Sequence, residues 1–136
     1  MPPLSIMIKP ASSLCNMRCE YCFYHDVTDY RDVKSFGFMN NDTARNIIKK
    51  ALDFADGESI SFAFQGGEPT LCGVEFFKTF CNTVNELNNK NSTIYYGLQT
   101  NGTLIDNKWA KFFKENNFLI GLSLDGDFSN NSFRID

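Results

Sequence analysis

Short apolar runs alternate with segments of helical periodicity along the chain. Apolar side chains that alternate with polar ones are typical of strands, whereas apolar side chains at every third or fourth position are typical of helices. By this criterion, strands are predicted over residues 4–9, 60–64, 93–98 and 118–124. The first predicted strand leads into a loop that holds three cysteines.

Helices are predicted between the later strands. The first helix is expected to start around Asn41 and Asp42, which are both good N-terminal caps, and to stop at Gly57. A second helix presents an apolar face between residues 74 and 87, and Asp106 caps a third. The side chains expected to face the core are Ala44, Ile47, Ile48, Ala51, Leu52, Ala55, Val74, Phe77, Cys81, Val84, Leu87, Trp109, Phe112 and Phe113.

Strands that alternate with helices of about three turns predict βαβ units and a parallel sheet. In such α/β folds, ligands bind at the C-terminal ends of the strands. That rule selects the cysteine loop and the segments 65–70, 99–102 and 123–126, which are all rich in glycine or polar residues. We therefore expect an α/β domain whose functional site lies at that edge of the sheet.

Composition and charge narrow the possible functions. The 136 residues are 43% hydrophobic, which is enough for one folded domain, and the 14 phenylalanines predict an aromatic core. The net charge of −3, without a basic stripe, argues against a nucleic-acid partner. The longest apolar runs are a few residues, so no membrane span is expected, and the N-terminus does not resemble a signal peptide.

The cysteines point to metal or redox chemistry. There are five, an odd number, and three of them crowd into eight positions. An oxidising compartment favours an even number of cysteines in a disulfide framework, so we expect a cytoplasmic protein.

Cys15, Cys19 and Cys22 have the spacing C-x3-C-x2-C. Thiolates at such spacing can converge on one soft-metal centre. Because iron–sulfur clusters normally use four thiolates, three would leave one iron of a 4Fe–4S cluster open to a substrate or cofactor. One alternative is a zinc site completed by His25, since Cys3His is a known zinc ligand set. Another is a disulfide pair with one spare thiol.

The run CNMRCEYC, from Cys15 to Cys22, resembles the signature of radical S-adenosylmethionine (SAM) enzymes. In that family three cysteines bind a 4Fe–4S cluster, and the amino and carboxylate groups of SAM chelate the fourth iron. The resemblance implies that Cys15, Cys19 and Cys22 are the cluster ligands and that Tyr21 lies beside the adenine.

The run GGEP at residues 66–69 resembles the glycine-rich segment of the same family, whose backbone carbonyls accept hydrogen bonds from the SAM ammonium group. Glycine suits this role because no Cβ blocks the approach of the backbone. The cofactor-binding residues implied by the resemblance are Tyr21, Gly66, Gly67, Glu68, Ser123 and Arg134. Gln65 and Asn101 are expected to face the cofactor or the substrate.

The segments 4–10, 22–25, 62–71 and 99–105 resemble, more narrowly, anaerobic sulfatase-maturating enzymes of the SPASM group. Those enzymes oxidise a Cys or Ser of a sulfatase to Cα-formylglycine. The implied chemistry is reductive cleavage of SAM to methionine and a 5′-deoxyadenosyl radical, which takes a hydrogen atom from Cβ of the target residue. The implied partners are a sulfatase polypeptide and an electron donor such as flavodoxin or ferredoxin.

The partial barrel of that family has six βα units, whereas four strands are predicted here. We therefore expect residues 1–136 to be a truncated radical SAM core, the N-terminal four units of a partial (βα)6 barrel. The auxiliary-cluster domain and the catalytic base are expected beyond residue 136, so the chain alone is expected to be inactive on peptides. The alternatives are another SPASM-type peptide maturase and a non-catalytic Cys3His zinc or Fe–S module.

Overall fold

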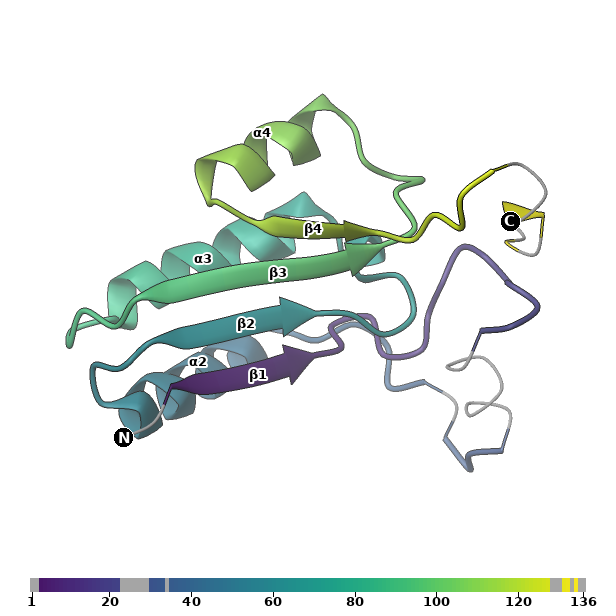
Figure 1. Ribbon diagram of the computed structural model, residues 1–136. Coiled ribbons are helices and arrows are strands. Elements are labelled where there is room, and N and C mark those ends of the chain that lie inside the picture. The colour runs from purple at the N-terminus through teal and green to yellow at the C-terminus, as the bar shows by residue number, and fades with distance from the viewer. Residues whose placement is uncertain (1–2, 23–29, 34, 128–130, 133, 135–136) are drawn as a thin grey trace.

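The computed structural model describes residues 3–22, 30–33, 35–127, 131–132 and 134. One parallel sheet contains the strands in chain order: β1 (Leu4–Ile8), β2 (Ile60–Phe64), β3 (Ile94–Thr100) and β4 (Leu119–Leu122). In Figure 1 the four arrows point to the same side, and the segments that follow β1 and β4 lie on that side. The predicted α/β fold with four parallel strands is confirmed.

In Figure 1 the helices lie behind the sheet and, for the last of them, above its β4 edge. They are α2 (Asn41–Ala55), α3 (Val74–Leu87) and α4 (Asn107–Glu115), together with the short 3-10 helix η1 (Pro69–Cys72). The side chain of Asn40, not Asn41 or Asp42, caps α2, because its Oδ1 accepts from the Thr43 N–H over 2.8 Å. Asp106 caps α4 as predicted, by accepting from the Trp109 N–H. Within the described residues, no helix is both long and apolar enough to cross a membrane.

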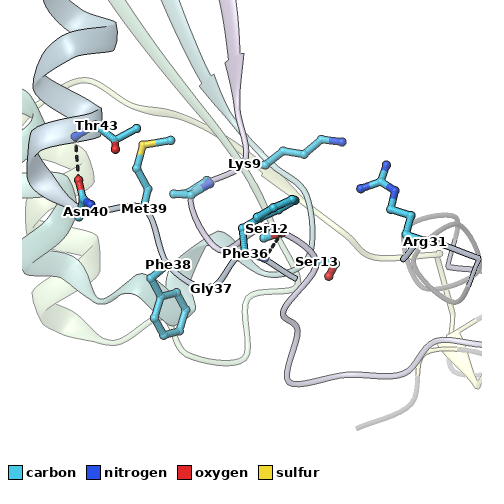
Figure 2. A pocket seen from close by; sticks show the side chains of 11 residues that line it. Lys9, Ser12, Ser13, Arg31, Phe36, Gly37, Phe38, Met39, Asn40 and Thr43 are labelled. Carbon is cyan, nitrogen blue, oxygen red and sulfur yellow. Dashed lines mark hydrogen bonds between the residues drawn. The ribbon is translucent and has the colours of Figure 1, made fainter. Parts of the chain in front are cut away.

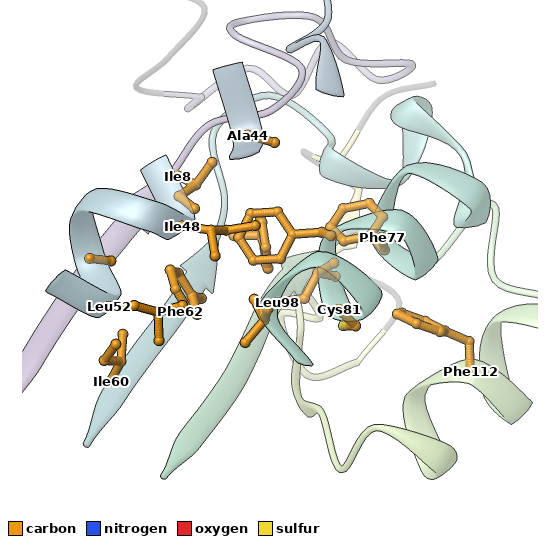
Figure 3. Close-up of a cluster of buried hydrophobic side chains, with 14 of the residues drawn as sticks. Ile8, Ala44, Ile48, Leu52, Ile60, Phe62, Phe77, Cys81, Leu98 and Phe112 are labelled. Carbon is orange, nitrogen blue, oxygen red and sulfur yellow. The ribbon is translucent and has the colours of Figure 1, made fainter. Parts of the chain in front are cut away.

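The hydrophobic core lies between the sheet and the helices (Figure 3). The rings of Phe62 and Phe64 are fully buried, and each meets the ring of Phe80 edge-on at centroid distances of 5.1 and 5.0 Å. Such pairs contribute about 0.5–1.5 kcal/mol each beyond the area they bury. Ile47, Val74 and Leu87 are partly buried against this core, and the other helix positions expected to face it are buried. The predicted aromatic core is confirmed.

Several element ends differ from the prediction. β1 ends at Ile8 instead of residue 9, and β4 is confined to Leu119–Leu122. β3 extends to Thr100, whose carbonyl accepts from the Ser123 N–H over 2.9 Å. The segment after β2, predicted only as a break, continues into η1, because Pro69 presets the helical φ and Glu68 caps the Thr70 N–H.

Candidate active site

A cavity of about 160 Å³ lies at the C-terminal ends of the strands. Its walls come from the loops after β1, β2 and β4 and from the end of β3. The lining residues are Cys15, Met17, Cys19, Tyr21, Cys22, Gln65, Gly66, Gly67, Glu68, Gln99, Thr100, Asn101, Ser123 and Arg134. Every site residue named from the sequence is among them. Gln99 and Thr100 were not singled out, although the strand-end rule selects their segment, and Met17 carried no signal of its own.

The diglycine bend, formed by Gly66 and Gly67, packs closely against the start of the cysteine loop. Gly66 and Gly67 have φ of 82° and 54°, in the left-handed region that favours glycine. A Cβ on Gly67 would lie 2.2 Å from the carbonyl oxygen of Leu14, and one on Gly66 would lie 2.6 Å from Cγ of Lys9. The absence of side chains therefore lets the two loops touch through their backbones.

The cysteine loop carries thiols that stay unpaired. All five cysteines of the chain are free thiols, which contradicts a disulfide pair with one spare thiol. The Met17 N–H donates to Cys15 Sγ over 3.4 Å, and the Cys22 N–H donates to the Cys19 carbonyl over 3.1 Å. Burial raises the pKa of Cys15, and the nearby Glu68, Cys22 and Cys19 raise it further. The higher pKa favours the neutral thiol of Cys15 in the metal-free chain, and a metal centre bound at this loop would favour the thiolate form.

The three loop thiols line one cavity without converging on a single metal-ion position. Within the described part of the chain, no group of three or more His, Cys, Asp or Glu side chains is placed to hold a metal ion. A zinc ion draws its ligands to within about 2.0–2.3 Å of one point. A four-iron cluster is a larger body, so its thiolates stand further apart around it. His25, the fourth ligand in the zinc alternative, lies outside the described residues.

Glu68 links the loop after β2 to the end of β3. Its side chain is buried, with 1% exposed, and its carboxylate accepts four hydrogen bonds. Oε2 accepts from the Thr70 N–H and from the hydroxyls of Thr70 and Thr100, and Oε1 accepts from the Asn101 N–H over 2.7 Å. The carboxylate is thus directed at the protein, and Glu68 fixes the shape of the cavity wall.

Tyr21 and Arg134 meet at Asp125, a residue that sequence reasoning did not assign to the site. The Tyr21 hydroxyl donates to Oδ2 of Asp125, and Nε of Arg134 lies 2.8 Å from the same oxygen. The Arg134 guanidinium also lies 5.4 Å from the centroid of the Tyr21 ring. Loss of hydration and the bond to Asp125 raise the pKa of Tyr21 to about 12. This network joins the cysteine loop to the segment after β4.

Ser123 and Gln65 line the cavity, and each makes a side-chain hydrogen bond to a neighbouring residue. The Ser123 hydroxyl accepts from Nε2 of Gln99 over 2.8 Å, and Gln65 Nε2 donates to the sulfur of Met7 over 2.6 Å. A Cβ at Gly121 would lie 2.1 Å from Gln99 Oε1, so this glycine leaves the space in which Gln99 reaches Ser123.

A larger cavity, of about 460 Å³, lies beside the loop that follows β1 (Figure 2). Lys9, Arg31 and Phe36 contribute to its wall, which includes no cysteine and no residue assigned to the site from the sequence. Cavity volume alone therefore does not identify the functional site. We place the candidate site in the smaller cavity, which is lined by both the loop thiols and the diglycine bend.

The chain is similar to proteins of known family. The sequence profile of the Radical SAM superfamily matches residues 10–134. A cysteine-type anaerobic sulfatase-maturating enzyme of Clostridium perfringens is 57% identical over 126 residues, which are 93% of this chain and 34% of that protein. A serine-type anaerobic sulfatase-maturating enzyme of Klebsiella aerogenes is 36% identical over 127 residues, 92% of this chain and 30% of that protein. The chain thus spans about a third of the length of these curated relatives.

Solved structures extend the similarity to three dimensions. Native anSMEcpe with bound AdoMet (SAM) superposes with a TM-score of 0.91 at 54% identity, covering 98% of this chain and 36% of that one. The same protein with bound AdoMet and Cp18Cys peptide gives a TM-score of 0.90 at 52% identity, covering 99% of this chain and 35% of that one. Because the profile match spans the loops that hold the three thiols, the diglycine bend and Arg134, the chain belongs to the radical SAM superfamily.

Proposed function

We propose that this chain is the cluster- and SAM-binding part of a radical SAM enzyme that oxidises a cysteine of a sulfatase to Cα-formylglycine. The observation that carries the proposal is the single cavity that brings three loop thiols together with the diglycine bend. The identity of 57% to a cysteine-type enzyme, against 36% to a serine-type enzyme, favours cysteine as the target residue. We further propose that residues 1–136 form four βα units of the family's partial barrel.

In this proposal, Cys15, Cys19 and Cys22 hold a 4Fe–4S cluster whose fourth iron is left for SAM. When bound, the cluster and SAM supply an electron and an organic radical that can remove a hydrogen atom from the peptide. Gly66 and Gly67 present backbone carbonyls to the SAM ammonium group. Glycine suits both positions because no Cβ blocks the approach to the backbone.

The remaining residues of the cavity orient the rest of SAM. Tyr21 lies at the adenine, held by Asp125. Arg134 and Ser123 contact the methionine and ribose end, and Gln65 lies towards the peptide. A sulfatase segment and a reducing partner such as flavodoxin or ferredoxin are the proposed partners, and a relative has been solved with a Cp18Cys peptide. The catalytic base expected beyond residue 136 stays a prediction.

The proposal is tested by anaerobic reconstitution of the chain with iron and sulfide. We expect a visible charge-transfer band and about four irons per chain. The triple variant of Cys15, Cys19 and Cys22 to Ala should lose this iron, whereas Cys72→Ala, which removes a thiol that does not line the cavity, should retain it. Addition of SAM should change the electron paramagnetic resonance (EPR) spectrum of the reduced cluster.

Two outcomes would contradict the proposal. Equal iron in the triple variant and the parent would show that the loop thiols are not the ligands. One tightly bound zinc per chain after aerobic purification, without iron, would favour the non-catalytic zinc module.

A further inference from the structure

We infer that Asn101 is a positioning residue for Cys15, whose sulfur its side-chain amide approaches. Asn101 Nδ2 lies 3.9 Å from Cys15 Sγ, although the two residues are 86 positions apart in the sequence. The inference deepens the proposed function and rests on it, because it concerns the first of the three proposed cluster ligands.

The side chain of Asn101 is fully engaged by the protein. Oδ1 accepts from the N–H and the hydroxyl of Thr103 over 3.0 and 2.8 Å, and Nδ2 donates to Asn16 Oδ1 over 2.9 Å. The second proton of Nδ2 is left for Cys15 Sγ. An amide has two donor and two acceptor positions, so these partners use all of them. This arrangement favours a role towards Cys15 over the substrate contact expected from the sequence.

The polar groups around Asn101 form a closed ring. Asn101 Nδ2 donates to Asn16 Oδ1, Asn16 Nδ2 donates to the Thr103 hydroxyl over 2.8 Å, and that hydroxyl donates to Asn101 Oδ1. Each member thus donates to the next, an arrangement in which hydrogen bonds polarise and strengthen one another. Because Asn16 directly follows Cys15, the ring holds the first cysteine against the loop after β3.

The ring is anchored to a rigid part of the fold. The Asn101 N–H donates to Oε1 of Glu68 over 2.7 Å, and Glu68 is buried between the ends of β2 and β3. The next N–H, of Gly102, donates to the Thr100 hydroxyl over 3.1 Å. A buried carboxylate therefore sets the position of Asn101, so the amide is preorganised before any metal binds.

An N–H directed at a ligand sulfur affects the redox behaviour of a cluster. Hydrogen bonds to the sulfurs are among the features that set the reduction potential of Fe–S clusters. Reduction adds negative charge, which a donor at the sulfur stabilises, so such a donor raises the potential. Removal of the Asn101 amide should therefore make the cluster harder to reduce.

The test is an EPR-monitored redox titration of the reconstituted chain. Asn101→Ala should keep its iron but show a several-fold lower ratio of reduced to oxidised cluster at a fixed potential. A tenfold change in this ratio corresponds to a shift of about 59 mV in the reduction potential of a one-electron couple. Asn101→Asp should lower the ratio further, because it replaces the donor by a negative charge. Asn16→Ala, which opens the ring but keeps the Asn101 amide, should shift the ratio less. Asn46→Ala, an exposed change on α2 away from the cavity, serves as the control.

Equal potentials in Asn101→Ala, Asn101→Asp and Asn46→Ala, with iron intact, would overturn the inference and leave the proposed function standing. Should Asn101→Ala fail to fold by circular dichroism, Asn101→Asp takes its place in the comparison, since its carboxylate still accepts from Thr103. Absence of iron from the parent would instead overturn the proposed function and this inference with it.

Discussion

The backbone N–H of Glu68 donates a 2.7 Å hydrogen bond to the carbonyl of Leu14. Leu14 directly precedes the first cysteine of the loop, and Glu68 directly follows the diglycine bend. This bond therefore sets the spacing between the thiols and the backbone proposed to meet SAM. The contact requires Gly67 to have no side chain, because any Cβ there would collide with the same carbonyl oxygen.

Gly67→Ala should separate the two loops. A non-glycine residue in the left-handed region costs about 1–2 kcal/mol, and here a backbone clash at 2.2 Å adds to that cost. Gly37→Ala is the control, since Gly37 has a φ of 75° but nothing within 4 Å of its Cβ position. We expect Gly37→Ala to lower the free energy of unfolding by the conformational cost alone. Gly67→Ala should lower it further and reduce the iron taken up on reconstitution, as measured by urea denaturation and iron analysis.

Similar losses of stability and iron in the two variants would show that the loops do not depend on close backbone contact at Gly67.

Features that repeat along the sequence could be predicted, whereas features that depend on distant partners could not. The spacing of Cys15, Cys19 and Cys22 predicts a metal centre, and the strand-end rule predicts that the diglycine bend lies at the same edge of the sheet, as the shared cavity confirms. The strand-end rule selects the segment that contains Asp125, but it could not give this residue a role, because that role depends on Tyr21, 104 positions away. The same holds for Asn16, which acquires its role only through Asn101.

Helix and strand ends were less predictable for a local reason. Asn40, Asn41 and Asp42 can all cap a helix, and only the backbone conformation decides among them. The end of β4 at Leu122 differs in kind, because the segment that follows it makes a long-range contact, from Asp125 to Tyr21 of the cysteine loop.

Glu68→Gln should destabilise the fold without changing its shape. Oε2 accepts three hydrogen bonds and Oε1 accepts one, so the amide nitrogen of a glutamine would face a donor in either orientation. Leaving a buried donor unsatisfied costs about 1–3 kcal/mol. Urea denaturation should show this loss, whereas Glu58→Gln, at an exposed position, should stay within about 0.5 kcal/mol of the parent. Equal stabilities of the two variants would mean that the carboxylate is not the link between β2 and β3.

The ion pair of Asp125 and Arg134 should make part of the stability depend on pH. Hydrogen bonds from Arg134 and Tyr21 lower the pKa of Asp125 below its ordinary value. A carboxyl group whose pKa is lowered by folding stabilises the folded state above its unfolded pKa of about 3.9, and this contribution is lost as the pH falls through the lowered value. The difference in urea midpoint between the parent and Asp125→Asn should therefore be constant from about pH 5 to 7 and shrink below about pH 4. A difference that grows on acidification would contradict the ion pair.

The five thiols should react with iodoacetamide in an order set by the fold. Burial raises the pKa of Cys72 and of Cys81 to about 11, so about one in a thousand of either is thiolate at pH 8. Cys15 is exposed, and Cys19 and Cys22 are half-buried around the cavity, whereas Cys81 is 3% exposed within the core. In the metal-free folded chain, the three loop thiols should be alkylated first, Cys72 more slowly, and Cys81 only on unfolding.

Peptide mass spectrometry of samples quenched over time measures this order, and labelling in concentrated urea provides the reference in which all five thiols react. Cluster reconstitution should protect the loop thiols and leave the slow reaction of Cys72 unchanged, because Cys72 does not line the cavity. Protection of Cys72 along with the loop thiols would point to a general tightening of the fold, whereas protection of the loop alone identifies its three sulfurs as the ligands.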